Sequence, residues 1–338
     1  MSAVLNVALA MSADVAAKVF PPDRLAAIDR ADELRLLTPR PLDSFQGAHA
    51  DAVLSEVDVL LTGWGSPVID EAVLDRAPRL RLIAHAGGSV KGHVGLAAWE
   101  RGVAVCSATD ANAQPVAEFA AAMILLAGKQ AFPLARIAAR SAASIVSDDI
   151  YPEMGNRGKR VGIVGASRIG RRTLALLRPY DLELVVHDPY LSQDDARALG
   201  ARAVSLEDLL RTSDVISLHA PALPETRHLL NRAGIALLRR GAVVVNTARG
   251  ALIDHDALTE RVVRGELTAI LDVTDPEELP IEHPLRTADH AFLTPHIAGS
   301  MGTELPRLAD SALNEACRFA RGEPLVSLVW QDELARQA

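Results

Sequence analysis

The stretch RVGIVGASRIG, residues 160–170, decides the fold. Its apolar first half is typical of a buried strand, and the residues from Gly165 to Gly170 are typical of a turn that opens a helix. Glycines in such a turn let the backbone approach a phosphate, which then lies at the helix N-terminus. The usual pattern has a middle glycine where this chain has Ser167. Because serine is small and its hydroxyl can donate to a phosphate, we still predict a dinucleotide turn.

An acidic residue follows at the expected place. Asp188 ends the next predicted strand, residues 184–188, and lies 18 residues after Gly170. A carboxylate there accepts hydrogen bonds from the adenine-ribose hydroxyls of NAD and repels the 2′-phosphate of NADP. Asp188 precedes Pro189, so it also fits a plain strand-end turn, and an arginine elsewhere could offset its charge. Strand, glycine turn, helix and acid together favour NAD.

The rest of the chain alternates short apolar runs with helical stretches, which is typical of parallel α/β folds. After Arg160 we predict five further strands, and six strands with crossover helices match a doubly wound sheet. The first third of the chain predicts three strands and one helix, enough for a smaller α/β domain. The predicted strands are residues 4–11, 57–62, 80–86, 184–188, 215–219, 242–246, 268–272 and 291–293, and the helices include residues 68–77 and 254–263.

A long apolar helix is predicted over residues 116–129, with Asn112 as its N-cap and Pro115 in its first turn. Its apolarity predicts burial between domains or subunits, and hence a homodimer. Residues 141–158 predict a loop. A final helix, residues 305–321, can return to the first domain. We therefore predict a flavodoxin-like substrate domain from residues 1–112 and 300–338, and a Rossmann NAD-binding domain from residues 113–299.

Composition limits the function. The chain has 338 residues, 49% of them hydrophobic, which allows full cores, and its formal charge of −8 argues against a nucleic-acid partner. Cys106 and Cys317 have no metal-ligand spacing and fit a reducing cytoplasm. No apolar run approaches the roughly 20 residues that a membrane span needs. We expect a cytoplasmic protein without a metal or a membrane partner.

Three segments end predicted strands at the sheet edge where ligands bind, and they contain Arg249, Glu277 and His296. Hydride transfer to a 2-oxo acid needs a cation for the carboxylate, which Arg249 can supply. It needs a proton for the carbonyl oxygen, which His296 can deliver, and a carboxylate such as Glu277 to orient that histidine. Taken singly, each residue also fits an ordinary loop or turn position. Their order after a dinucleotide turn favours the chemistry.

These segments resemble the family of D-isomer-specific 2-hydroxyacid dehydrogenases. The resemblance covers the chain well from about Leu80 onwards. The matching stretches are residues 115–118, 162–170, 187–190, 217–221, 246–258, 271–280 and 293–299. It implies that Arg249 binds the substrate carboxylate and carbonyl, that His296 is the acid/base and that Glu277 is its partner. The cofactor contacts expected from the motifs and the resemblance are Gly165, Ser167, Arg168, Ile169, Gly170, Asp188, His219, Pro221, Thr247, Ala248, Asp272, His296 and Gly299.

The resemblance also implies that a loop of the small domain offers backbone N–H groups to the substrate. Here that loop is AGGSVK, residues 86–91, with Gly88, Ser89 and Val90 as substrate contacts. The family usually has an acidic residue where Lys91 stands and a second glycine near Ser89. Lys91 fits either a plain surface lysine or a residue that attracts a phosphorylated or doubly acidic substrate.

Two functions follow as hypotheses. The first is an NAD-dependent oxidoreductase that interconverts a 2-oxo acid and a D-2-hydroxy acid. The second is an NAD-sensing, corepressor-like interaction protein that retains the three residues without turnover, since a fold and a site do not guarantee their use.

Overall fold

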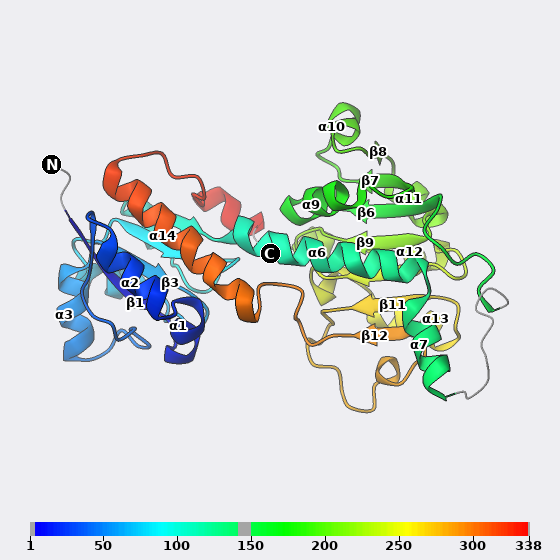
Figure 1. Cartoon of the computed structure of the whole chain (residues 1–338), viewed down its shortest axis with the longest axis horizontal. Helices are drawn as coiled ribbons and strands as arrows, with labels where there is room; N and C mark the ends of the chain where they lie inside the picture. Colours follow the sequence, from blue (N-terminus) through cyan, green and yellow to red (C-terminus); the bar gives the residue numbers. More distant parts are fainter. Residues whose placement is uncertain (1–3, 141–149, 337–338) are drawn as a thin grey trace. The chain divides into compact units, whose positions relative to one another are not determined.

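The computed structural model describes residues 4–140 and 150–336, which fold as two compact units (Figure 1). Met1–Ala113 and Ser300–Gln337 make the first unit, and Gln114–Gly299 makes the second. Of the loop predicted over residues 141–158, residues 141–149 lie outside the described ranges. Residues 151–158 contain neither helix nor strand.

The first unit has a five-stranded sheet with the order β2-β1-β3-β4-β5, in which all pairs are parallel. This order is that of flavodoxin-like folds. The strands are β1 (Leu5–Ala10), β2 (Leu34–Leu36), β3 (Val59–Thr62), β4 (Leu82–His85) and β5 (Ala104–Ser107). The helices are α1 (Ala13–Val19), α2 (Pro22–Arg30), α3 (Ala48–Glu56), α4 (Glu71–Arg76), α5 (Ala97–Glu100) and α14 (Leu305–Arg321).

Helices bury both faces of this sheet. Leu5, Val7 and Leu9 pack with α1, α2 and α14, whereas Ala8 and Ala10 pack with α3, α4 and α5. A strand whose two faces are both buried reads as a continuous apolar run, which is why β1 could be predicted from the sequence. Helix α14 is tied to α2 by an ion pair between Arg24 and Asp310 at 2.9 Å.

The second unit has a seven-stranded sheet with the order β12-β11-β10-β9-β6-β7-β8, and again all pairs are parallel. The strand order reverses between β6 and β9, which is the switch point where doubly wound sheets bind ligands. The strands are β6 (Lys159–Val164), β7 (Leu182–His187), β8 (Arg202–Ala203), β9 (Val215–Leu218), β10 (Val243–Asn246), β11 (Thr268–Leu271) and β12 (Ala291–Leu293).

Two sets of helices cover this sheet. One face packs against α6 (Thr109–Gly128), α9 (Arg168–Leu177) and α10 (Gln193–Ala198), and the other against α11 (Leu206–Thr212), α12 (Arg232–Leu237) and α13 (His255–Val263). Helix α7 (Ala131–Arg140) stacks Phe132 on Phe292 of β12. The two parallel sheets confirm the predicted fold class of a Rossmann domain and a smaller flavodoxin-like domain.

Some details of the prediction were wrong. Helix α6 begins at Thr109, so Asn112 lies within it rather than at its N-cap, and Pro115 lies beyond the first turn. The Asn112 side chain instead accepts a hydrogen bond from Ser300 N at 2.9 Å. Strands β2, β5 and β8 were missed, and β2 and β8 have only three and two residues, too few for a periodic pattern.

Helix α6 is apolar because its own chain covers it. Ala121, Ile124 and Ala127 belong to the buried core beneath the second sheet. Within the described ranges, no single helix is long and apolar enough to cross a membrane, although α6 and α7 together pass as a pair bent by 61°.

Candidate active site

His296 and Glu277 meet at the C-terminal edge of the second sheet. His296 follows β12 and Glu277 follows β11, and the Nδ1 atom of His296 lies 2.6 Å from Oε1 of Glu277. Both side chains are about half exposed, at 52% and 56%. His296 has a left-handed backbone with φ of 55°, which is uncommon for a residue other than glycine and is found at functional sites. The pair leaves Nε2 of His296 as the ring atom that can face a substrate.

Asp272 holds the segment that carries His296. Its buried carboxylate accepts hydrogen bonds from the Thr294 hydroxyl at 2.6 Å, Ile297 N at 2.8 Å and Ala298 N at 2.9 Å. Its carbonyl oxygen accepts from His296 N at 3.0 Å. These bonds fix the residues on both sides of His296 and compensate for its unusual backbone. Asp272 was predicted as a cofactor contact, and that contact stays a prediction.

Arg249 lies in a tight turn after β10. Asn246 shapes this turn, because its Nδ2 donates to the Arg249 carbonyl at 2.9 Å and its Oδ1 accepts from Ala248 N at 3.0 Å. The guanidinium is half-buried and donates to the Ala248 carbonyl at 2.7 Å. Burial lowers the pKa of Arg249, and the charge of Glu277 opposes that shift. The Arg249 guanidinium therefore lies within electrostatic reach of the Glu277 carboxylate.

Gly250, next to Arg249, is required by close packing. A Cβ atom there would lie 2.0 Å from both the carbonyl carbon and the oxygen of Thr274, and 2.5 Å from Asp275 N. The turn that carries Arg249 thus rests directly on the backbone of the loop that carries Glu277. Three sequence-distant segments converge at one edge.

The glycine turn after β6 leaves little room for side chains. Gly165 has φ of 97°, and a Cβ on it would lie 2.6 Å from Ala220 N. A Cβ on Gly170 would lie 2.1 Å from the Gly165 carbonyl oxygen. Ser167 caps α9, since its Oγ accepts from Gly170 N at 3.3 Å. The hydroxyl proton of Ser167 can still be donated to an anion.

Asp188 joins the end of β7 to this turn. One carboxylate oxygen accepts from Ala166 N at 2.7 Å and the other from Tyr190 N at 2.9 Å. Asp188 therefore serves the local turn and also lies beside the glycine turn. Each oxygen keeps a second lone pair for a ribose hydroxyl.

The remaining predicted cofactor residues lie near the same edge in several environments. Arg168 is exposed and Ile169 half-buried in the first turn of α9, Pro221 and Gly299 are half-buried, and Ala248 is buried. His219 is buried, its Nε2 lies 2.9 Å from Ser217 Oγ, and burial lowers its pKa to about 4. The predicted contact between His219 and a cofactor stays a prediction.

These features fit a dinucleotide. Gly165 and Gly170 let the turn pack tightly against the backbone of its neighbours, and the N-terminus of α9, whose dipole favours anions, follows that turn. Thr247 is buried after β10, and its hydroxyl has no hydrogen-bond partner within the described part of the chain. Buried polar atoms normally form a hydrogen bond, and an amide or hydroxyl group of a bound cofactor is a suitable partner for this hydroxyl.

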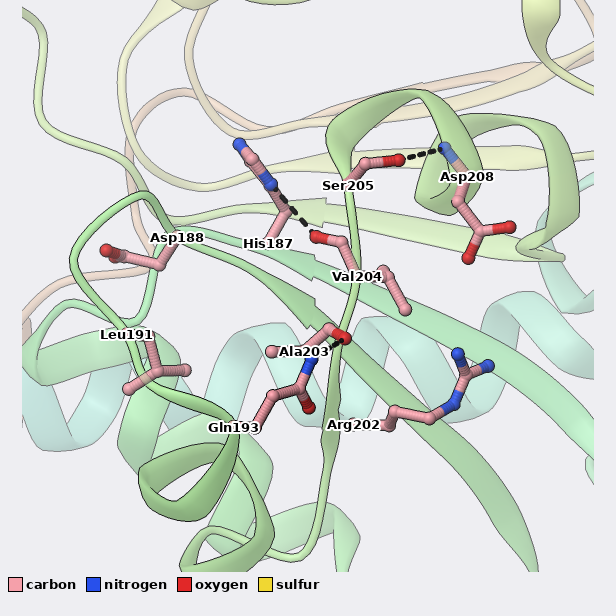
Figure 2. A pocket seen from close by; sticks show the side chains of 9 residues that line it. All are labelled: His187, Asp188, Leu191, Gln193, Arg202, Ala203, Val204, Ser205 and Asp208. Carbon is pink, nitrogen blue, oxygen red and sulfur yellow. Dashed lines mark hydrogen bonds between the residues drawn. The ribbon is translucent and has the colours of Figure 1, made fainter.

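An open cavity of about 470 Å³ borders Asp188 on the β8 side of the sheet, and Figure 2 shows its largely polar lining. His187 Nδ1 lies 3.1 Å from the Val204 carbonyl, and Gln193 donates to the Ala203 carbonyl at 2.9 Å. Arg249, Glu277 and His296 do not line this cavity. We do not assign the chemistry to it.

The predicted substrate loop follows β4 in the first unit. The Thr109 hydroxyl donates to the Gly88 carbonyl at 2.6 Å, and Lys91 N donates to Ser89 Oγ at 3.2 Å. Gly88 and Ser89 are half-buried and Lys91 is exposed. Val90 belongs to the core, so only its backbone can reach a ligand. Substrate binding by this loop stays a prediction.

Some contributors were not foreseen. Asn246 and Thr274 had no predicted role, and Asp272 had a different one. An asparagine that ends a buried strand two residues before a closed turn is a signal for such a turn. No comparable signal identifies the groups that donate to Asp272, because they lie 22 to 26 residues away.

Comparison with known proteins agrees with this geometry. Residues 122–298 match the family described as D-isomer specific 2-hydroxyacid dehydrogenase, NAD binding domain. A glyoxylate reductase of Aeropyrum pernix is 32% identical over 85% of this chain and 88% of its own length. A D-3-phosphoglycerate dehydrogenase of Methanocaldococcus jannaschii is 32% identical over 80% of this chain and 51% of its own length.

This chain thus spans about half the length of the curated phosphoglycerate dehydrogenases that it matches. Among solved structures, the TT0316 protein from Thermus thermophilus is 31% identical, covers 96% of this chain and all of its own, and has a TM-score of 0.73. The chain belongs to the family of D-isomer-specific 2-hydroxyacid dehydrogenases, and residues 122–298 form its NAD-binding domain.

Proposed function

We propose that this protein reduces a 2-oxo acid to a D-2-hydroxy acid, and oxidises it in reverse, with Arg249, Glu277 and His296 as its reaction centre. The observation that carries the proposal is the 2.6 Å contact between His296 Nδ1 and Glu277 Oε1, beside the Arg249 turn, whose Gly250 packs on the backbone of the loop that carries Glu277. A histidine oriented through one nitrogen presents the other as a proton donor. A nearby guanidinium is the cation suited to a carboxylate.

In the reductive direction, the Arg249 guanidinium binds the substrate carboxylate and polarises the neighbouring carbonyl. NADH, when bound, supplies the hydride that forms the new C–H bond at the carbonyl carbon. The carbonyl π-electron pair moves to oxygen, and His296 Nε2 gives its proton to that oxygen. Glu277 holds the ring during the transfer and stabilises its charged form. In the oxidative direction, His296 takes the hydroxyl proton.

Residues of the second unit would hold the cofactor. Gly165, Ser167 and Gly170 suit the pyrophosphate, and Asp188 suits the adenine ribose. The unpartnered hydroxyl of Thr247 and the residues around Gly299 suit the nicotinamide side. Gly88, Ser89 and the backbone of Val90 are proposed to bind the substrate carboxylate end.

Substitution of His296 tests the assignment of the acid/base. We expect His296→Ala to lower kcat by about 10²- to 10⁴-fold, the usual contribution of a positioned acid, while NADH still binds. His49→Ala, at an exposed position of α3, is the matched control and should keep wild-type turnover. Near-wild-type turnover of His296→Ala on several 2-oxo acids would refute the mechanism.

A screen of NADH oxidation defines the substrate class. Glyoxylate, hydroxypyruvate, pyruvate and 2-oxoglutarate test small, hydroxylated, methyl-bearing and doubly acidic side chains in turn. If the enzyme prefers 2-oxoglutarate or a phosphorylated acid, and Lys91→Ala abolishes that preference, Lys91 attracts the second acidic group of the substrate.

NADPH in place of NADH tests the prediction that Asp188 selects NAD. Equal rates with the two cofactors would contradict it. An inactive protein that binds a partner only with NAD would instead favour the interaction role.

The proposal includes a cytoplasmic homodimer. Leu126 of α6, which exposes 41% of its surface, is one apolar position that a second copy would cover. Light scattering should then give about twice the 36.0 kDa of one chain. A mass of one chain at micromolar concentration would refute the dimer.

A further inference from the structure

Thr274 ties down the loop that carries Glu277. It lies three residues after β11 and is 9% exposed, whereas Pro276 and Glu277, two and three residues further along the chain, are exposed. Its hydroxyl oxygen lies 2.8 Å from the Pro276 carbonyl oxygen and 2.9 Å from that of Glu277. One hydroxyl proton is therefore shared between the backbones of these two residues. The backbone of Glu277 is anchored while its carboxylate holds His296.

The backbone of Thr274 also supports the opposite side of the site. Gly250 packs against its carbonyl group so closely that an added Cβ would overlap both atoms at 2.0 Å. Gly250 directly follows Arg249, whose turn Asn246 closes from the other side. The Arg249 turn can shift toward the loop that carries Glu277 only if the Thr274 backbone moves with it.

We propose that Thr274 is a positioning residue that sets the spacing between the Arg249 guanidinium and the Glu277–His296 pair. Its hydroxyl fixes one partner and its carbonyl supports the other, so one residue joins both halves of the reaction centre. The catalytic part of this inference rests on the proposed function. The alternative is that the hydroxyl only stabilises a surface turn, in which case its loss would lower stability without moving the catalytic groups.

Paired variants separate these two roles. Thr274→Val replaces the hydroxyl by a methyl group of similar size, and Thr274→Ser keeps the hydroxyl. We expect Thr274→Val to lower kcat by about 10-fold or more, because displacements near 1 Å at a reaction centre can cost up to about 100-fold. The Kd for NADH should stay within about twofold, and Thr274→Ser should restore most of kcat. Thr274→Ala provides a second variant without the hydroxyl if the valine variant does not fold.

Thr287→Val is the matched control. Its hydroxyl also donates to a proline carbonyl, that of Pro284 at 3.4 Å, in an exposed turn of the same unit. It should leave kcat unchanged. If Thr274→Val keeps kcat within about twofold of the wild type, or if Thr274→Ser loses as much as the valine variant, the positioning role is refuted.

A spectroscopic readout makes the test independent of turnover. The proton between His296 Nδ1 and Glu277 Oε1 should give a far-downfield NMR signal, since short charge-assisted hydrogen bonds deshield their protons. The signal is assigned by its loss in His296→Gln. It should shift or broaden in Thr274→Val and persist in Thr274→Ser, and an unchanged signal in Thr274→Val would overturn the inference. If the wild type turns over no 2-oxo acid but the signal responds in this way, the proposed function fails and the positioning role stands.

Discussion

The carboxylate of Asp272 should decide the position of His296, and Asp272→Asn tests this directly. The wild-type side chain accepts three hydrogen bonds from residues 294, 297 and 298 while being only 3% exposed. An asparagine of the same shape has one acceptor oxygen and one amide donor. At least one N–H group of the loop must then face another donor.

The size of the effect follows from these contacts. A hydrogen bond to a charged acceptor contributes about 1.5–3 kcal/mol, and the variant loses at least one of them. Opening of the loop should become easier by that amount, which corresponds to amide exchange about 10- to 100-fold faster at Ile297 and Ala298. We also expect kcat to fall by about 10-fold or more, because His296 lies between the anchored residues.

Hydrogen exchange followed by mass spectrometry or NMR measures the loop, and steady-state kinetics measures turnover. Asp254→Asn is the matched control, since Asp254 caps α13 by accepting from Ala257 N at 3.0 Å, and asparagine caps a helix equally well. Wild-type exchange at Ile297 and Ala298 in Asp272→Asn, together with wild-type kcat, would show that the carboxylate does not position the histidine.

Three further predictions follow from packing and charge. Gly250→Ala should destabilise the second unit by about 1–3 kcal/mol in urea unfolding, because its Cβ would overlap the Thr274 backbone, whereas Gly234→Ala, whose nearest neighbour is a side-chain atom at 3.2 Å, should cost much less; equal costs would contradict this. Arg249→Lys should lower kcat/KM by at least about 10-fold because a lysine cannot bind a carboxylate bidentately. An unchanged value would exclude bidentate binding of the substrate carboxylate by Arg249. Burial lowers the pKa of His85 from 6.5 to about 3, so below about pH 6.5 the unfolded chain takes up a proton that the folded chain excludes. The free energy of unfolding should therefore fall as the pH drops. Urea unfolding at pH 6.5 and at pH 5 should show that His85→Gln loses about 2 kcal/mol less of this free energy than the wild type does; equal losses would reject this cause.

The sequence predicted the elements that carry strong local signals. The strands beneath Arg249 and Asp188 are buried on both faces, so they stand out as apolar runs that end in a polar residue. The glycine turn at Gly165 could be predicted because a positive φ and a close approach both exclude side chains there. Such features are fixed by residues within one turn or strand, which a sequence displays directly.

What the sequence did not predict depends on distant neighbours. Asparagine is a common N-cap residue, but α6 starts three residues before Asn112. The Asn112 side chain instead accepts a hydrogen bond from Ser300 N, 188 positions further along the chain. The apolarity of α6 predicted a partner surface, and its residues Ala121, Ile124 and Ala127 pack in the core of the second sheet of its own chain. Periodicity reports that a face is buried and does not report what buries it.

Polar positioning residues explain how a half-exposed pair can be held in place for the proposed reaction centre. His296 and Glu277 each expose about half of their side chains, so burial alone does not hold them. The buried carboxylate of Asp272 fixes the histidine segment, and the buried hydroxyl of Thr274 anchors the glutamate backbone. Reacting groups can therefore remain open to a substrate while the buried polar atoms one layer below supply the rigidity. Substitutions in that lower layer should reduce turnover more than cofactor affinity, which distinguishes this arrangement from one in which the surface loops are ordered only by the ligand.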